Sequence, residues 1–363
     1  MSVLLMTGFP GFLGSALLPR LLARRTQVRA LLLVQPRHLE TARRRIREIE
    51  AEHPHVRGRV DVVEGDITQP GLGMSDVPHD ELGAVTEVWH LAAVYDLATS
   101  AELARRVNVD GTAHVLDFCR SREHLDRLQY VSTCYVSGRY DGVFAETDLD
   151  EGQIFRNHYE ETKFEAEVLV RKAMADGLPA TIYRPGIVVG DSATGATQKY
   201  DGPYFVATFL RRQPPVAVVP RVASPDEVRF CLVPRDFVVD AMDTLSASEL
   251  SIGKTYALTD PEPPTIREVV DTFAHELHRR IVWVPLPLGV THAAVDKVPG
   301  MERLLGLPAE AIDYLASPTL YDTTQTTTDL AGTGVTCPPF RTYAARLLRF
   351  MADHPEFDAK AMT

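Results

Sequence analysis

The sequence has little lysine, few cysteines and no long apolar run. Only six of its 363 residues are lysine, at positions 163, 172, 199, 254, 297 and 360, so a lysine within a motif is informative. The four cysteines, at positions 119, 134, 231 and 337, form no C-x-x-C pair, which argues against a disulfide framework and against a zinc site. We therefore expect no metal and a reducing, cytoplasmic location.

Basic residues are outnumbered by acidic ones. The chain has 38 basic and 49 acidic residues and a net charge of −11, which argues against binding a nucleic-acid backbone. No window approaches the roughly 18 apolar residues of a transmembrane helix. The apolar start, Val3–Met6, leads directly into a glycine turn and does not resemble a signal peptide. We expect neither a nucleic-acid partner nor a transmembrane segment, and a monomer or homodimer.

Short apolar runs alternate with amphipathic stretches through the first half of the chain. The pattern predicts strands at Val3–Met6, Val28–Val34, Val60–Glu64, Glu87–Leu91, Leu128–Ser132 and Ala180–Tyr183. It predicts helices at Phe12–Arg24, His38–Glu52, Ala101–Arg122 and His158–Asp176. This alternation indicates an α/β fold, a Rossmann-type doubly wound parallel sheet with helices on both faces.

The pattern loosens after residue 185. We predict helices at Arg235–Leu245, Thr265–Leu277 and Tyr343–Ala352, a strand at 255–258 and a polar loop at Thr323–Thr328. Residues 1–190 form the predicted NADP-binding domain, with returning elements at about 230–260, and residues 191–229 and 261–363 form a smaller, interleaved substrate-binding region. Gln213–Val222 and Ile281–Val290, rich in valine and proline, are candidate walls of a lipophilic pocket or core of the smaller domain.

A glycine-rich turn, Thr7-Gly8-Phe9-Pro10-Gly11-Phe12-Leu13-Gly14, follows the first strand and opens a helix. Gly8 permits the tight turn, Gly11 lets the backbone approach a pyrophosphate, and Gly14 lets the helix pack on the strand. The free N–H groups and the helix dipole at this position hold an anion. The strand–turn–helix setting predicts a dinucleotide site, the alternative being a glycine-rich turn without a ligand.

The end of the second predicted strand favours NADP over NAD. An NAD site usually has Asp or Glu here to accept from the ribose 2′-hydroxyl, but this chain has Gln35 and Arg37. Arg37 is suited to a 2′-phosphate. The nearby run Arg43-Arg44-Arg45 is either a second phosphate partner or a solvated helix face. We expect NADP(H), with NAD(H) as the alternative.

Tyr159 and Lys163 form the only Y-x-x-x-K pattern in the chain. Residues four apart share one face of a helix. A nearby cation lowers the phenol pKa from its unperturbed value of about 10, so that Tyr159 can exchange a proton with a substrate oxygen. Thr133, at a predicted strand end, is placed to hydrogen-bond the same oxygen. The alternative for so short a pattern is an ordinary surface pair on a helix.

In combination, these motifs resemble the extended short-chain dehydrogenase/reductases. Within them the chain is most similar to the branch that contains fatty acyl-CoA reductases and the thioester-reductase domains of carboxylic acid reductases and peptide synthetases. The matching segments are Thr7–Gly14, Gly65–Thr68, His90–Ala93, Asn108–Thr112, Val131–Thr133, Tyr159–Lys163 and Arg184–Ser192, with a weaker echo at Val233–Val238.

The resemblance implies a role for each matching position. Asp66 and Ile67 would contact the adenine, and Leu91-Ala92-Ala93 would line the cofactor. Pro185, Gly186 and Ile187 would hold the nicotinamide amide through their backbone. Thr133, Tyr159 and Lys163 would be catalytic, and Asn108 would be a structural or proton-relay residue. Gln35 departs from the pattern, because the thioester branch commonly has Arg there.

The sequence thus predicts an NADP(H)-dependent oxidoreductase that reduces a carbonyl to an aldehyde or alcohol. The resemblance implies a lipophilic, fatty acyl-CoA-like thioester, which arrives as a free CoA ester or on a separate carrier protein. One alternative is an NAD(P)-dependent secondary alcohol or hydroxysteroid-type dehydrogenase, or a ketone reductase. Another is a non-catalytic dinucleotide-binding sensor.

Overall fold

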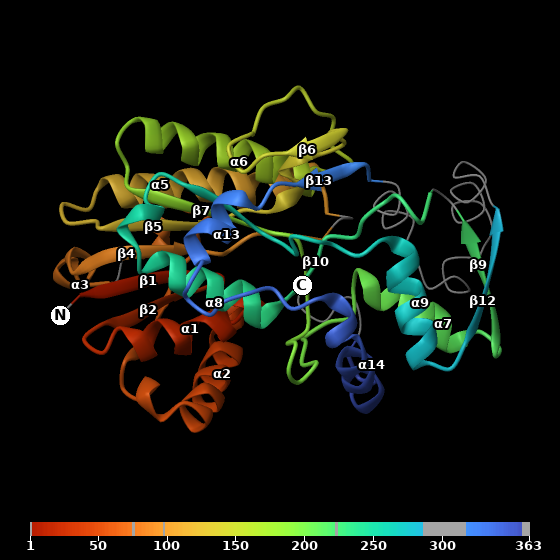
Figure 1. Ribbon diagram of the computed structural model, residues 1–363. Helices are drawn as coiled ribbons and strands as arrows, with labels where there is room; N and C mark the ends of the chain where they lie inside the picture. Colours follow the sequence, from red (N-terminus) through yellow and green to blue (C-terminus); the bar gives the residue numbers. More distant parts are fainter. Residues whose placement is uncertain (1, 75–76, 97–98, 222–223, 286–316, 358–363) are drawn as a thin grey trace.

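The computed structural model describes residues 2–74, 77–96, 99–221, 224–285 and 317–357. Its centre is a seven-stranded sheet in the order β11-β7-β5-β4-β1-β2-β3, in which all neighbours are parallel (Figure 1). The strands are β1 (Val3–Thr7), β2 (Arg29–Val34), β3 (Val60–Glu64), β4 (Val85–His90), β5 (Arg127–Val131), β7 (Ala180–Pro185) and β11 (Thr255–Leu258). The strand order reverses between β1 and β4, which places a ligand site at the carboxyl ends of these strands.

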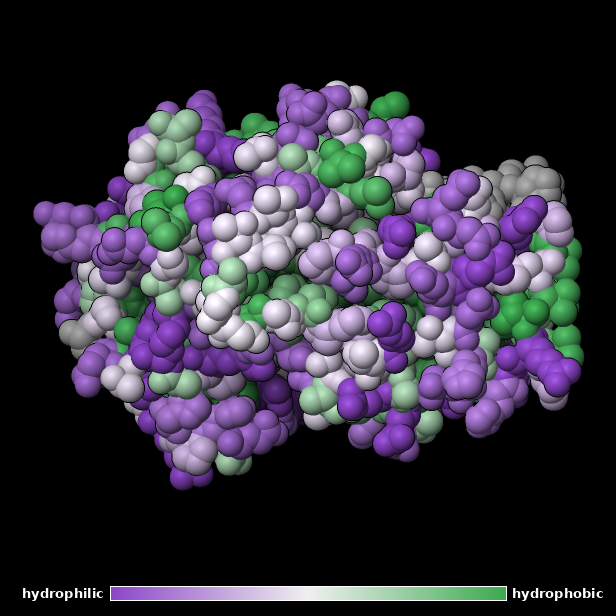
Figure 2. All heavy atoms as spheres, viewed as in Figure 1, coloured by the Kyte–Doolittle hydropathy of each residue, from purple (hydrophilic) through white to green (hydrophobic). Residues whose placement is uncertain are grey.

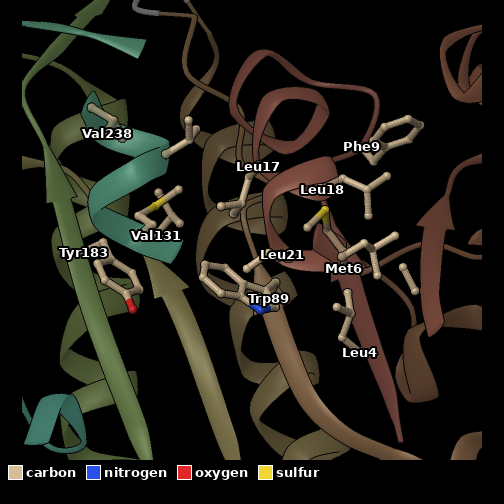
Figure 3. Packing of buried hydrophobic residues seen from close by; sticks show 14 of the residues in the cluster. Leu4, Met6, Phe9, Leu17, Leu18, Leu21, Trp89, Val131, Tyr183 and Val238 are labelled. Atoms are coloured by element: carbon tan, nitrogen blue, oxygen red, sulfur yellow. The ribbon is translucent and has the colours of Figure 1, made fainter. Parts of the chain in front are cut away.

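Helices cover both faces of the sheet. α1 (Phe12–Arg24), α2 (Leu39–Glu52) and α8 (Arg235–Ser246) lie on one face, and α5 (Gly111–Arg120) and α6 (His158–Ala175) lie on the other (Figure 1). On the first face, Leu4, Met6 and Trp89 of the sheet pack against Leu17 and Leu21 of α1 (Figure 3). The predicted Rossmann-type, doubly wound fold is confirmed.

The predicted strands of the sheet are all present, with boundaries shifted by at most two residues. Every residue of β1 and of β5 is buried. Strands with helices on both sides are apolar along most of their length, so their sequence signal is strong.

The predicted helix at Ala101–Arg122 changes its winding along its length. It consists of α4 (Ala101–Ala104), a π-helical stretch η4 (Arg105–Asp110) and α5. Asn108 lies in the π-helical stretch, and its side chain bonds both the N–H and the C=O of Val94, at 2.9 and 3.0 Å. The predicted helix is thus present from Ala101 to Arg120, and the change to π-helical winding within it accompanies the contact of Asn108 with the loop at Val94.

A second group of elements has its own apolar core. It contains α7 (Pro203–Arg212), α9 (Ile266–Glu276), α14 (Ala344–Asp353) and a two-stranded sheet of β9 (Val216–Arg221) and β12 (Arg280–Pro285). These elements lie beyond one end of the large sheet, on the right of Figure 1. Two short strands, β8 (Ile187–Val189) and β10 (Leu232–Pro234), pair with each other.

Part of the C-terminal region returns to the large sheet. β13 (Thr319–Tyr321) pairs with β6 (Gly142–Phe144), and α13 (Thr324–Leu330) contacts β11 and α8. The polar loop predicted at Thr323–Thr328 is wrong, because the buried Glu146 carboxylate accepts the N–H groups of Gln325 and Thr326 at 2.6 and 3.2 Å. This carboxylate satisfies donors at the start of α13, which its own sequence leaves uncapped.

The predicted substrate-binding region at 261–363 thus includes elements that lie against the large sheet, and the functional division of the chain stays a prediction. Among the helices described, none is both long enough and apolar enough to cross a bilayer.

Candidate active site

The glycine-rich turn joins β1 to α1. Gly8 has φ of 84°, and a Cβ there would lie 2.7 Å from the backbone N of Ala92. A Cβ on Gly11 would lie 2.6 Å from the Gly8 carbonyl oxygen, so the turn requires both glycines. α1 begins at Phe12 with no side-chain cap and no acidic residue in its first turn. This uncapped, positive helix end fits a dinucleotide pyrophosphate, held by backbone N–H groups such as those of Phe12 and Leu13.

The turn is tied to the neighbouring strand β4. The Thr7 hydroxyl accepts a hydrogen bond from the Ala92 N–H at 3.2 Å and contacts Nδ1 of His90 at 2.8 Å. Both Thr7 and His90 are buried. The structure therefore places the segment Leu91-Ala92-Ala93 beside the glycine turn, as a cofactor-lining role requires.

Gln35 and Arg37 lie at the carboxyl end of β2. Arg37 is exposed and donates from Nε to the side-chain oxygen of the half-buried Gln35 at 3.0 Å. Arg45, from the neighbouring basic run, instead pairs with Glu48 at 2.9 Å. Of the basic residues considered for a 2′-phosphate, Arg37 is thus the one placed at the strand end.

Asp66 and Ile67 follow β3, which pairs with β2. The Asp66 carboxylate accepts the N–H of Thr68 at 2.8 Å, which closes a local turn. Ile67 is buried against Gly111 at the start of α5. Because β2 and β3 are parallel, these two residues lie at the same carboxyl ends of the strands as Gln35 and Arg37. Their contact with an adenine stays a prediction.

Thr133 and Tyr159 come together from two elements. Thr133 follows β5 and caps the short helix η5 (Cys134–Ser137), where its hydroxyl accepts the Tyr135 N–H at 3.2 Å. Tyr159 lies in the first turn of α6, and its hydroxyl is near enough to the Thr133 hydroxyl for Thr133 to act on its pKa. The two hydroxyls predicted to share a substrate oxygen are therefore adjacent.

Lys163 lies one turn after Tyr159 but directs its ammonium group elsewhere. Nζ donates to the Tyr130 hydroxyl at 3.0 Å and to the Val131 carbonyl at 2.9 Å. Burial lowers the pKa of Lys163 to about 7, although the nearby Glu167 carboxylate partly opposes the shift.

The predicted lowering of the Tyr159 pKa is wrong for this arrangement. Burial of the phenol raises the pKa of Tyr159 to about 12, and the Thr133 hydroxyl only partly offsets the rise. The physical reason is that burial removes the charged phenolate from water, and this cost exceeds the stabilisation that Thr133 gives to the phenolate. Tyr159 is accordingly a protonated hydrogen-bond donor near neutral pH.

Asn108 has the contacts of a structural residue. Besides its two bonds to Val94, its amide nitrogen donates to the Thr162 hydroxyl on α6 at 3.0 Å. The side chain is 2% exposed. Asn108 thus connects the loop after β4 to the helix that carries Tyr159 and Lys163.

Pro185, Gly186 and Ile187 lie where β7 ends and β8 begins. The Gly186 N–H bonds the Leu258 carbonyl at 3.1 Å, and the Ile187 N–H bonds the Cys231 carbonyl at 2.8 Å. A Cβ on Gly186 would lie 2.4 Å from the Cys231 carbonyl oxygen. The Thr133 hydroxyl lies 3.5 Å from the Pro185 carbonyl, so this segment adjoins one of the two hydroxyls predicted to be catalytic.

The sequence reasoning missed a buried ionic cluster centred on Glu167. Its carboxylate accepts from Arg184 at 2.6 Å, from Arg171 at 3.0 Å and from the Ser132 hydroxyl at 2.6 Å. Burial alone would raise the pKa of Glu167, but Arg184 and the other donors hold it below its usual range. Glu167 follows Lys163 by four residues, as Lys163 follows Tyr159, and this repeat was the available signal.

The predicted pocket walls fall mainly on β9 and β12, which pair in a separate sheet at the far right of Figure 1. Val216, Val218, Val282 and Val284 are 42% to 50% exposed, and Figure 2 shows hydrophobic side chains at this end of the molecule. Residue 222 and residues 286–290 lie outside the described part of the chain. The role of these segments as pocket walls stays a prediction.

Comparison with known proteins adds independent information. Residues 6–242 match the family profile described as male sterility protein, an NAD-binding family. The chain is 29% identical over 268 residues to a linear gramicidin synthase polypeptide of Brevibacillus parabrevis, covering 71% of this chain and 5% of that protein. It is 29% identical over 216 residues to the L-2-aminoadipate reductase large subunit of Penicillium chrysogenum, covering 54% of this chain and 15% of that protein.

A solved structure is similar over nearly the whole chain. The terminal R domain from the myxalamid PKS-NRPS biosynthetic pathway has a TM-score of 0.81 and 28% identity, covering 99% of this chain and 92% of that one. The chain therefore spans a small fraction of these two curated relatives but almost all of one reductase domain. With the strand–turn–helix cradle and the Tyr159–Lys163 helix in place, these matches show that the chain belongs to the male sterility protein family and is an extended short-chain dehydrogenase/reductase of the thioester-reductase-like branch, an NAD(P)-dependent oxidoreductase.

Proposed function

We propose that the chain reduces an acyl thioester with NADPH to an aldehyde, and in a second turnover to an alcohol. The observation that carries this proposal is the neighbouring pair of hydroxyls from Thr133 and Tyr159, at the carboxyl ends of the strands and beside Pro185. Two donors that converge on one point suit a carbonyl oxygen on which negative charge develops.

The dinucleotide supplies the hydride when it is bound, and the chain supplies binding and proton donation. The glycine turn and the start of α1 bind the pyrophosphate. Thr133 and Tyr159 donate hydrogen bonds to the carbonyl oxygen and stabilise the charge that forms there. The raised pKa of Tyr159 favours this role, because the phenol keeps its proton until the substrate oxygen takes it.

The proposed reaction balances as a two-electron reduction. Addition of one hydride to the thioester carbon and one proton to its oxygen gives a hemithioacetal. Its C–S bond then breaks, which releases the aldehyde and a thiol. A further hydride and proton convert the aldehyde to an alcohol.

The proposed substrate is a lipophilic acyl group on coenzyme A or on the pantetheine arm of a carrier protein. Two of the similar proteins carry the names of a gramicidin synthase and of a PKS-NRPS biosynthetic pathway, which supports a carrier-bound thioester. We propose NADPH over NADH because Arg37, which suits a 2′-phosphate, lies at the end of β2. In the structure its guanidinium group donates to the Gln35 side chain.

The test is a substrate panel with the purified chain. Acyl-CoAs, acyl-pantetheines, aldehydes and ketones are assayed with NADPH, and secondary alcohols with NADP⁺, the oxidant that they require, while cofactor absorbance and released thiol are measured together. We expect one thiol for every one or two NADPH consumed. Turnover of secondary alcohols or ketones without any thiol release from thioesters would overturn the thioester proposal and favour the alcohol dehydrogenase alternative. Dinucleotide binding without turnover of any substrate would indicate a sensor.

A further inference from the structure

A row of buried polar side chains runs from Lys163 through Tyr130, Thr112 and His90 to Thr7 in the glycine-rich turn. We propose that Tyr130 is a positioning residue for Lys163, and that Thr112, His90 and Thr7 hold Tyr130 in that role. This inference rests on the proposed reductase function. All five residues are buried, and they come from β1, β4, β5, α5 and α6.

The direction of each hydrogen bond follows from one fixed point. The Asn108 carbonyl can only accept, so the Thr112 hydroxyl, 2.6 Å away, donates its single proton there. Thr112 must then accept from Nε2 of His90 at 3.1 Å, and its second lone pair is open to the neighbouring Tyr130 hydroxyl, on whose pKa Thr112 acts. The Tyr130 oxygen is left to accept from Nζ of Lys163.

The same reasoning sets the tautomer of His90. Burial, and next the charge of Lys163, lower the pKa of His90 to about 3, so the ring is neutral. Because Nε2 donates to Thr112, Nδ1 has no proton and accepts from the Thr7 hydroxyl at 2.8 Å. Thr7 in turn accepts from the Ala92 N–H. Each hydrogen-bond donor in this row of side chains therefore has one acceptor.

This arrangement fixes Lys163 and does not carry protons away from it. This row of side chains ends at the Asn108 carbonyl on one branch and at the Ala92 amide on the other. Neither of these groups can accept a proton and pass it on. Two protons of the ammonium group are directed to Tyr130 and Val131, which leaves one for the site. Tyr130 thus determines where the remaining N–H of Lys163 points.

The test is Tyr130→Phe, which keeps the aromatic ring, whose centroid lies 4.6 Å from Nζ, and deletes only the hydroxyl. We expect kcat/KM to fall about 10- to 100-fold, the range for loss of a hydrogen bond to a charged group. Dinucleotide affinity, measured by fluorescence titration, falls in parallel. The buried ammonium loses an acceptor, so the alkaline limb of kcat/KM moves to lower pH.

The groups that act on Lys163 allow this limb to be assigned. Glu167 on α6 has a lowered pKa, and His90 on β4 has a pKa of about 3, so neither titrates near neutral pH. Burial raises the pKa of Tyr130 itself on β5, and burial raises that of Tyr159 to about 12. If the alkaline limb of kcat/KM lies near neutral pH and moves in Tyr130→Phe, it therefore reports the titration of Lys163.

Tyr183→Phe is the matched control. Tyr183 is a buried tyrosine on the adjacent strand β7, faces the opposite side of the sheet, and donates to Gln129 at 2.8 Å (Figure 3). It loses one buried hydrogen bond without touching Lys163. We expect a comparable loss of stability but an unshifted pH limb and unchanged dinucleotide affinity.

Two further comparisons keep the inference falsifiable. If Tyr130→Phe fails to fold, Thr112→Val is expected to shift the same limb in the same direction, and Thr112→Ser to restore it. The positioning role is overturned if the variant that folds, Tyr130→Phe or Thr112→Val, leaves the pH limb and the dinucleotide affinity unchanged, as Tyr183→Phe does, while Lys163→Met is inactive. The reductase proposal stands in that case. If Lys163→Met keeps full activity, the proposed catalytic site itself is wrong.

Discussion

Ser132 donates a hydrogen bond to the Glu167 carboxylate at 2.6 Å, from the end of β5 to the middle of α6. Ser132 precedes Thr133, and Glu167 lies one turn beyond Lys163. The bond therefore connects the two segments that carry the proposed catalytic hydroxyls, those of Thr133 and Tyr159. Arg184 on β7 completes the cluster from the next strand, so three elements share one buried charge pair.

Glu167→Gln is expected to destabilise the fold. The amide keeps the shape of the side chain but leaves the buried Arg184 without its counter-charge, and breaking a buried pair in this way costs about 3–5 kcal/mol of unfolding free energy. Urea unfolding measures the change. Asp226→Asn, which removes an exposed partner of Arg267, serves as the control and is expected to leave the midpoint unchanged. Equal midpoints for the two variants would contradict a stabilising role of the cluster.

Tyr159→Phe is expected to lower kcat by roughly 10²- to 10⁴-fold, because it deletes the proposed proton donor while keeping the ring. The dinucleotide dissociation constant should change little, since the phenol is not its main anchor. Steady-state kinetics and fluorescence titration provide the two measurements. Tyr140→Phe, which alters a tyrosine packed against Phe144, is the control. Near-wild-type turnover in Tyr159→Phe, with a substrate that the wild type reduces, would exclude this residue as the donor.

Lys163→Met is expected to change how stability depends on pH. The folded pKa of Lys163 is lowered to about 7, so between that pH and the higher pKa of the unfolded chain the unfolded state binds one proton more. Within this window the unfolding free energy of the wild type should rise with pH relative to Lys163→Met, by at most about 1.4 kcal/mol per pH unit. Urea unfolding at several pH values from 6 to about 10 tests the slope. A constant difference between the two proteins would show that Lys163 titrates normally in the fold.

Arg37→Ala is expected to reduce the preference for NADP over NAD. Arg37 is the basic group at the end of β2, so its loss should weaken NADPH binding and leave NADH binding nearly unchanged. Gln35→Asp should move the preference further towards NAD, because a carboxylate repels a 2′-phosphate and accepts from a 2′-hydroxyl. The ratio of kcat/KM for the two cofactors is the measurement, and Arg45→Ala, at a residue already paired with Glu48, is the control. A wild-type preference for NAD that Arg37→Ala leaves intact would refute NADP specificity.

Local patterns in the sequence were sufficient for the large sheet and for part of the site. Buried parallel strands are apolar along most of their length, so β1 and β5 were predictable within a residue or two. The glycine turn depends on residues adjacent in the chain, and the shared helix face of Tyr159 and Lys163 depends only on their spacing of four.

Contacts between distant segments required the tertiary structure. Lys163 meets Tyr130 across 33 positions, and Glu146 caps α13 from nearly 180 positions away, and no local periodicity encodes either partner. The same holds for the π-helical turn at Asn108, whose side chain bonds the loop at Val94, and for the pKa of Tyr159, which burial raises to about 12. The sequence by itself determined which chemical groups are present and which strands and turns carry them. Only packing decided how far those groups are from water and which neighbour each one bonds, because desolvation and hydrogen bonding depend on segments that the chain brings together when it folds.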